Sequence, residues 1–300
     1  MKKLISLLLS LVLVLSVCGC GEKSYQKEDG TNVVTTYKDG VSFAIFTDAH
    51  VGASESHNFR VTKAVEFVNQ TDYIDFAVFL GDNIHSGYTE TDLAKEQVAK
   101  FKEITSGFEK PYYYLRGNHD EAINDFPEHF VVECGDVAFI AFYSKIMWRN
   151  EKPYASGWGV PAEDLKWLEE TLEKCRGKRV IFGCHVGIVQ DNPNFNTWLE
   201  SKAVDEKTGE VLLDFGREKI LELAEKYNVE LYFNGHEHNR DVPNGVAGTM
   251  IDFNLGSIGG DGVYSVVTVE KDKAIIEIRD LNVDGIRKKL DYQFRFDIVK

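Results

Sequence analysis

Residues 229–238 read VELYFNGHEH, in which a run of apolar and β-favouring residues ends in a glycine turn and two histidines follow. The apolar run predicts a buried strand. His236 and His238 stand one residue apart after Gly235, so both imidazoles can point into the same crevice beyond the strand. Imidazole nitrogen is a common ligand of first-row metals. The stretch therefore predicts part of a metal site at the end of a buried strand.

The rest of the chain alternates between strand-like runs and helical spacing. Strands are predicted at 41–48, 76–82, 112–118, 137–144, 179–185 and 229–236, and helices at 56–70, 91–105, 161–174 and 216–228. Further strands are predicted at 250–256, 263–270, 274–280 and 293–299. The alternation indicates an α/β core, and the strand-rich tail indicates added antiparallel strands. The weakly patterned segment 187–214 is predicted to be a long insertion, which in compact domains is often functional.

Five of the predicted strands end in residues that bind metals or move protons. They are Asp48 and His50 in FTDAHVG, Asp82 in FLGDN, Asn118, His119 and Asp120 in LRGNHD, His185 in FGCH, and His236 and His238 in NGHEH. Ligands of α/β sheets bind beyond the carboxyl ends of the strands, where these residues lie. Histidine with carboxylate suits Zn, Mn or Fe. So large a set exceeds one tetrahedral ion and suits two ions that share a bridging carboxylate.

Taken in order, the blocks D-x-H, G-D-N, G-N-H-D, G-x-H and G-H-x-H resemble the calcineurin-like metallophosphoesterase superfamily. The resemblance covers about residues 41–300 and implies a four-layer α/β/β/α sandwich, with two mixed β-sheets flanked by helices. It also implies a dinuclear site. One ion would be held by Asp48, His50 and His238, the other by Asn118, His185 and His236, with Asp82 as the bridge and His119 facing the substrate.

The resemblance implies hydrolysis of small phosphomonoesters or phosphodiesters. A metal-bridging hydroxide would attack the phosphorus, and His119 would act as general acid or electrostatic stabiliser for the leaving alkoxide. The alternative is a non-catalytic, surface-anchored lipoprotein that binds metal or a solute on the same scaffold. Because all the expected ligands and His119 are present, the sequence favours an enzyme.

Within the superfamily, the segment GDNIHSG departs from two branches. His85 and Ser86 replace the second Asp and the Arg of the protein-phosphatase block, and His85 stands where purple acid phosphatases carry a tyrosine. Asp120 has two readings, a helix N-cap or local acceptor and a catalytic group. His57, His85 and His129 are predicted to be surface or core histidines.

Aromatic residues gather in the least regular segments, namely Trp148, Tyr154, Trp158, Phe195 and Trp198. They could stack a nucleobase or cover a lipid or sugar moiety, or they could simply pack their own loops.

The formal net charge of −14 disfavours nucleic acid as a partner, because phosphate backbones require a basic surface. A small anionic substrate remains compatible if bound metal reverses the local charge. Without a CxxC pair, the sequence indicates neither a cysteine zinc site nor a redox motif, so Cys134, Cys175 and Cys184 are predicted to be small buried or half-buried apolar residues.

The N-terminus carries a targeting signal, with Lys2 and Lys3 before an apolar run at 4–17. Cys20 follows Gly19 as in a bacterial lipobox, so we expect a lipoprotein signal peptide at 1–19 and a lipid on Cys20. The alternative is an ordinary cleaved signal peptide. With lipidation, a flexible tether at 20–40 would connect a bacterial membrane to an extracytoplasmic domain at 41–300.

Overall fold

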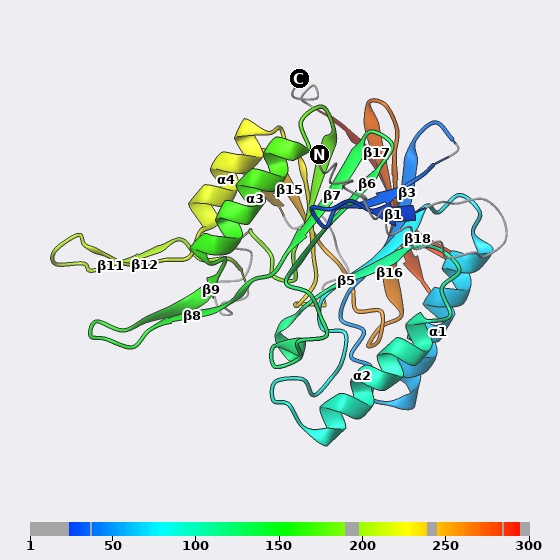
Figure 1. Cartoon of the computed structure of the whole chain (residues 1–300), viewed down its shortest axis with the longest axis horizontal. Coiled ribbons are helices and arrows are strands. Elements are labelled where there is room, and N and C mark those ends of the chain that lie inside the picture. Colours follow the sequence, from blue (N-terminus) through cyan, green and yellow to red (C-terminus); the bar gives the residue numbers. More distant parts are fainter. Residues whose placement is uncertain (1–23, 37, 190–197, 239–244, 284, 295–300) are drawn as a thin grey trace, which may run out of the picture.

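The computed structural model describes residues 24–36, 38–189, 198–238, 245–283 and 285–294 (Figure 1). Two large sheets form its centre. The eight-stranded sheet runs in the order β1 (Ser24–Gln26), β2 (Asn32–Val34), β6 (His129–Cys134), β7 (Val137–Phe142), β10 (Arg179–Gly183), β13 (Leu231–Asn234), β15 (Met250–Asn254) and β14 (Gly245–Ala247). The six-stranded sheet runs in the order β18 (Gly285–Gln293), β17 (Lys273–Asp280), β16 (Val263–Val269), β3 (Val41–Phe46), β4 (Phe76–Leu80) and β5 (Tyr112–Leu115).

Both sheets are mixed. Strands β7, β10, β13 and β15 are parallel in the first sheet, and β3, β4 and β5 are parallel in the second. Antiparallel strands of the C-terminal region, β16, β17 and β18, extend the second sheet from β3. The strand-rich tail therefore adds antiparallel strands to an α/β core, as the sequence predicts.

Helices cover the outer face of each sheet. On the six-stranded sheet, α1 (Glu55–Gln70) and α2 (Asp92–Thr105) bury residues such as Val61 and Phe101 against the strands. On the eight-stranded sheet, α3 (Ala162–Lys174) and α4 (Arg217–Lys226) do the same with Leu168 and Leu223. The two helix pairs lie on opposite sides of the molecule in Figure 1.

The inner faces of the two sheets share one apolar core. Phe43 and Phe76 stack at 4.9 Å between ring centroids on one sheet, and Phe139 of the other sheet meets Phe43 edge-on at 5.4 Å. Because such a core removes a large apolar area from water, it fixes the two sheets against each other. The architecture is the predicted four-layer α/β/β/α sandwich.

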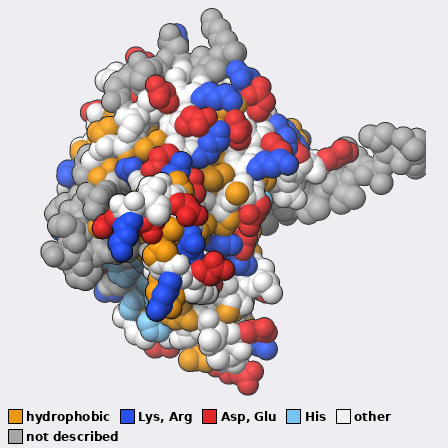
Figure 2. Space-filling view, turned by 90° about the vertical axis from the view of Figure 1, so that its left-hand side faces the viewer, with side chains coloured by type: hydrophobic (Ala, Val, Ile, Leu, Met, Phe, Trp, Pro, Cys, Tyr) orange, Lys and Arg blue, Asp and Glu red, His pale blue; other side chains and the backbone are white. Residues whose placement is uncertain are grey.

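Two hairpins project together from the eight-stranded side of the body (Figure 1). One is made by β8 (Lys145–Arg149) and β9 (Ala155–Gly159), the other by β11 (Lys202–Val204) and β12 (Val211–Asp214). Figure 2 looks at the side from which they project. The β11–β12 hairpin lies in the insertion predicted at 187–214, of which 190–197 are outside the described residues.

Part of the predicted tether at 20–40 is ordered on the eight-stranded sheet, because β1 and β2 lie within residues 24–34. Strands β1 and β2 pair with each other, and β2 pairs in parallel with β6. Val34 is 2% exposed in the core between the sheets, and Lys27 forms a salt bridge with Glu133 at 2.8 Å. The burial of Val34 and this ion pair hold the segment on the sheet, although its short, polar-flanked strands give no clear periodicity.

The ends of the chain differ from the prediction in one further respect. The outer strand β18 covers Gly285–Gln293, whereas the strand was predicted at 293–299, most of which lies outside the described residues. Residues 1–23, with the predicted signal peptide and Cys20, also lie outside them. In the part of the chain that is described, none of the helices has the length and apolarity needed to cross a membrane.

Candidate metal centre

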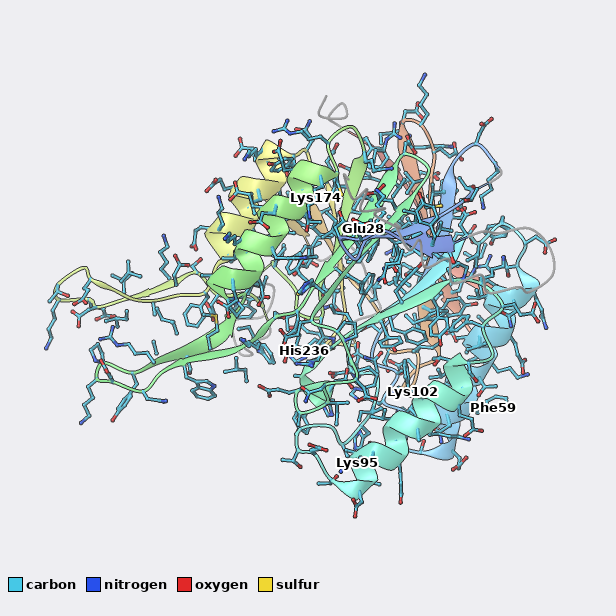
Figure 3. All side chains as sticks on the ribbon, in the orientation of Figure 1. Glu28, Phe59, Lys95, Lys102, Lys174 and His236 are labelled. Atoms are coloured by element: carbon cyan, nitrogen blue, oxygen red, sulfur yellow. The ribbon has the colours of Figure 1, made fainter. Side chains whose placement is uncertain are left out.

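The predicted site residues come together where strands of both sheets end. Asp48 and His50 follow β3, Asp82 follows β4, His185 follows β10, and His236 and His238 follow β13. Asn118 and His119 lie in a short 3₁₀ turn, η1 (Asn118–Asp120), after β5. Figure 3 labels His236 near the middle of the view. The site therefore lies at the carboxyl ends of strands from both sheets.

The backbone of the candidate ligands is unusual. Six non-glycine residues of the described chain have positive φ, and five of them are candidate ligands. These are Asp48, His50, Asp82, His236 and His238, with φ between 42° and 70°. Such a conformation costs on the order of 1–3 kcal/mol for a residue with a side chain, so its concentration here marks a functional site.

Asp48, His50 and His238 form the first group. Nε2 of His238 lies 3.1 Å from Oδ1 of Asp48 and 3.4 Å from Nε2 of His50. Nε2 of His50 lies 3.9 Å from the same oxygen of Asp48. The ligand atoms of the three side chains all lie within 4.8 Å of one another, a spacing that one ion can bridge.

Asp82, His185 and His236 form the second group, again within 4.8 Å of one another. Oδ1 of Asn118 joins it, at 3.0 Å from Nε2 of His185 and 2.9 Å from Nδ1 of His236. Asp82 faces both groups, because its Oδ1 lies 3.2 Å from Nε2 of His185 and its Oδ2 lies 3.7 Å from Nε2 of His50.

Neighbouring groups hold the candidate ligands in place. Oδ2 of Asp48 accepts hydrogen bonds from the Thr47 hydroxyl at 2.7 Å and from the amide of His236 at 3.1 Å. Nδ1 of His185 contacts the carbonyl of Leu80 at 2.8 Å, which turns Nε2 toward the site. Oδ1 of Asp48 is buried and accepts no hydrogen bond. A buried carboxylate oxygen in this condition, surrounded by imidazoles, fits a bound cation.

Burial and charge set the protonation of the imidazoles. Burial lowers the pKa of His50 and of His236 to about 4, so both rings are neutral at neutral pH and offer lone pairs. Burial also lowers the pKa of His185, but the charge and hydrogen bond of Asp82 together with the charge of Asp48 and the hydrogen bond to Leu80 outweigh it and raise this pKa to about 9. Metal binding to His185 would therefore release a proton.

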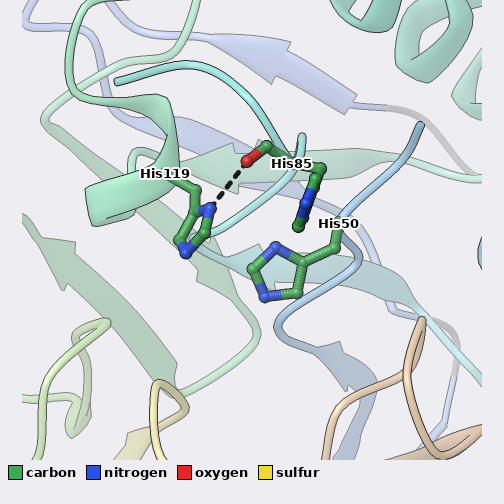
Figure 4. Close-up of side chains that lie close together, drawn as sticks. All are labelled: His50, His85 and His119. Carbon is green, nitrogen blue, oxygen red and sulfur yellow. Dashed lines mark hydrogen bonds between the residues drawn. The ribbon is translucent and has the colours of Figure 1, made fainter. Parts of the chain in front are cut away.

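His119 lies beside the two groups and belongs to neither. Its Nδ1 is 2.7 Å from the carbonyl of His85, and its Nε2 is hydrogen-bonded to the hydroxyl of Tyr88 (Figure 4 draws the first contact). Since Nδ1 must donate to the carbonyl, Nε2 of the neutral ring is the acceptor and faces the cleft. Nε2 also lies 3.9 Å from Oδ2 of Asp82.

His85 and Tyr88 are the site residues that the sequence did not indicate. The His85 ring stacks on His119 with 5.7 Å between centroids, and His50, His85 and His119 have ring nitrogens within 4.8 Å of one another. The only sequence signal was the position of His85, three residues after Asp82. A cleft of about 490 Å³ is lined by these three histidines and also by His57. The ring of His129 packs on Trp167, with 4.0 Å between the ring centroids.

Asp120 is a local hydrogen-bond acceptor. It is fully buried, and its carboxylate accepts from the amides of Asn83 and Ile84 at 3.0 Å each and of Gly117 at 2.9 Å. It therefore ties the loop after β4 to η1. Of the aromatic residues for which the sequence left substrate contact or loop packing open, Trp158 and Trp198 are buried, Trp148 and Tyr154 are exposed, and Phe195 lies outside the described residues.

The sandwich fold and the paired ligand groups are those of the metallophosphoesterases, a class of metal-dependent phosphoester hydrolases that use dinuclear sites. The chain belongs to the calcineurin-like phosphoesterase family, whose model matches residues 41–240. A probable glycerophosphodiester phosphodiesterase, GpdQ, from Arcobacter nitrofigilis is 29% identical over 178 residues, which are 55% of this chain and 56% of that protein. The chain thus spans about half the length of this curated relative.

Solved structures support the fold. A dimetal phosphatase from Danio rerio matches with a TM-score of 0.61 and 12% identity, over 86% of this chain and all of the other. GAP50, the anchor in the inner membrane complex of Plasmodium, matches with a TM-score of 0.60 and 13% identity, over 87% of this chain and 90% of the other. At such identities the likeness concerns the fold alone.

Proposed function

We propose that the protein is a dinuclear, metal-dependent phosphoesterase that hydrolyses small phosphate esters. One observation carries the proposal: there are two groups of ligand atoms, and within each group the atoms lie within 4.8 Å of one another. The Asp82 carboxylate belongs to the second group and also faces His50 of the first. Asp48, His50 and His238 would hold one ion, Asn118, His185 and His236 the other, and Asp82 both. Bound divalent ions, whether Mn, Fe or Zn, supply charge that neutralises phosphate oxygens and lowers the pKa of water.

The chain's own residues would then do three things. The neutral Oδ1 of Asn118 adds a ligand without adding negative charge, which keeps the site attractive to an anionic ester. As an imidazolium, His119 would carry a second proton on Nε2 and deliver it to the departing alkoxide, which leaves the neutral ring with its proton on Nδ1. The contact between Nδ1 of His119 and the carbonyl of His85 fixes the orientation of the ring for this transfer.

The substrate class follows from the chemistry and from the relative. We include both phosphomonoesters and phosphodiesters, and we favour diesters because the relative from Arcobacter nitrofigilis bears the name of a phosphodiesterase. The test is hydrolysis of p-nitrophenyl phosphate and bis-p-nitrophenyl phosphate by the full chain loaded with Mn, Fe or Zn. Metal-dependent turnover, faster on the diester, is expected. No turnover on either ester with any metal would contradict the proposal and favour a metal-binding or solute-binding lipoprotein.

We also propose that the enzyme works outside the cytoplasm, anchored to a membrane by a lipid on Cys20. The support is the sequence of residues 1–20, in which a basic start and an apolar run precede Gly19 and Cys20. An ordinary cleaved signal peptide would give the same compartment without the anchor.

A further inference from the structure

The hairpin of β8 and β9 has two unlike faces. Residues directly opposite each other in a hairpin share a face, so Met147 and Gly157 lie on one side and Trp148 and Ser156 on the other. The Met147 side packs toward Phe215, because a Cβ on Gly157 or Gly159 would come within 3.1 Å of Phe215 or closer. The two glycines therefore let this side lie close against the neighbouring residues.

The other side of the hairpin carries apolar residues from the metal centre outward. Trp158 meets the ring of His236 edge-on at 5.1 Å between centroids. Ile146 is paired with Trp158, and Trp148 lies two residues farther along β8, about 7 Å at the rise of a strand. We call Trp158, Ile146 and Trp148 the apolar strip.

Exposure increases along the apolar strip with distance from the site. Trp158 is 8% exposed, Ile146 39% and Trp148 64%. In the view of Figure 2, hydrophobic side chains are gathered beside the histidines on the face from which the hairpins project. A large indole left in water beside a second apolar side chain is a common mark of a binding surface.

We propose that the apolar strip binds a long alkyl group of the ester, while its phosphate occupies the metal centre. This inference rests on the proposed function. The occupant follows from continuity: the strip starts at His236, so a ligand lying on it has its polar end at the metal centre and its apolar end on Trp148. A phosphodiester with one long alkyl group has this arrangement.

The test compares two phosphodiesters that differ only in chain length, methyl p-nitrophenyl phosphate and octyl p-nitrophenyl phosphate. Burying methylene groups is favourable, so KM of the metal-loaded protein for the octyl ester should be lower by roughly tenfold or more. Trp148→Ala should raise KM for the octyl ester about fivefold and leave KM for the methyl ester unchanged. Trp148→Phe keeps an aromatic ring, so its KM for the octyl ester should stay close to that of the unmodified protein. Phe59→Ala is the matched control, because Phe59 is 61% exposed on α1, away from His236 in Figure 3.

Binding supplies a readout that does not depend on turnover. Octylphosphonate should shift the tryptophan emission of the metal-loaded protein to shorter wavelength, because the exposed indole of Trp148 becomes covered. Methylphosphonate should cause no such shift, and Trp148→Phe should abolish it.

The outcomes separate the strip from the reaction. Equal KM values for the two esters in the unmodified protein, or equal losses for both in Trp148→Ala, would overturn the role of the strip and leave the phosphoesterase standing. If neither ester is hydrolysed, the proposed phosphoesterase activity is wrong. The shift in tryptophan emission alone would then test whether the apolar strip binds the alkyl group. A dimer that Trp148→Ala converts to monomers with both KM values unchanged would assign the strip to self-association and overturn the inference.

Discussion

Nε2 of His238 lies 3.1 Å from Oδ1 of Asp48, and the two residues follow strands that belong to different sheets. Asp48 comes after β3 of the six-stranded sheet, and His238 comes after β13 of the eight-stranded sheet. The first group of ligands therefore exists only when the two sheets pack through their shared core. A metal that binds this arrangement binds the folded chain selectively and must stabilise it.

Removal of the His119 side chain should slow the chemistry without releasing metal. His119 lies beside both ligand groups and belongs to neither, and general acid help is typically worth about 10²–10⁴-fold. We expect His119→Ala to lose roughly that much in kcat, with its metal content unchanged by elemental analysis.

The leaving group supplies a control for this role. An activated p-nitrophenolate needs little protonation, so the defect of His119→Ala should be small with p-nitrophenyl esters and large with alkyl esters. Loss of metal from His119→Ala, or full activity on alkyl esters, would refute the assignment.

Asp252 should be a positioning residue that joins the two histidine loops of the eight-stranded sheet. Its Oδ2 accepts from the amides of Ile188 and Val189 at 2.8 Å and 2.9 Å, and its Oδ1 accepts from Asn234. Asp252→Ala leaves three donors without their acceptor at about 1–3 kcal/mol each, so we expect a loss of about 3 kcal/mol or more in the free energy of unfolding. Urea denaturation measures this loss.

Asp272→Ala is the matched control for Asp252→Ala, since Asp272 is exposed. Its effect should stay within about 0.5 kcal/mol. Similar stabilities of the two variants would show that the buried carboxylate of Asp252 contributes no more than a surface one.

Gly235 should be required for its size. A Cβ at this position would collide with Oγ1 of Thr47 and Oδ2 of Asp48, the pair that orients the first ligand group. Gly235→Ala should therefore weaken metal binding by roughly 10–100-fold, as disturbance of groups behind metal ligands typically does. Competition with a chelator measures the affinity. The control is Gly285→Ala, which should bind metal normally because a Cβ at Gly285 would meet only the carbonyl oxygen of Val283, at 3.6 Å. Equal metal affinities of Gly235→Ala and Gly285→Ala would refute the steric role of Gly235.

The anchor is tested at Cys20. The unmodified protein should partition into detergent when expressed in a bacterium, and Cys20→Ala should either release it or block its processing. Cys134→Ala, which alters a buried cysteine, should partition like the unmodified protein. If the unmodified protein is wholly soluble, the lipid anchor on Cys20 is refuted and the ordinary cleaved signal peptide is the remaining interpretation.

The sequence predicts the parts of the molecule whose residues follow a strong local pattern. The buried strand at 229–236 is a continuous apolar run, the helix at 161–174 has clear periodicity, and the candidate ligand residues follow the ends of predicted strands. The small strands β1 and β2 could not be predicted in this way, because their order comes from the pairing of β2 with β6 and of β1 with β2. Tyr88 was missed for a similar reason: only the folded chain brings its hydroxyl to His119. In the hairpin of β8 and β9, only β8 alternates, between half-buried and exposed residues, and the alternation is too brief to stand out.

The number of metal ions per chain tests the central claim most directly. Two groups of ligands, joined by Asp82, predict close to two transition-metal ions per chain after reconstitution with Mn, Fe or Zn, measured by elemental analysis of the gel-filtered protein. Asp82→Ala should hold fewer and lose activity with them. One ion or none in the unmodified protein, with every metal tried, would contradict the dinuclear site.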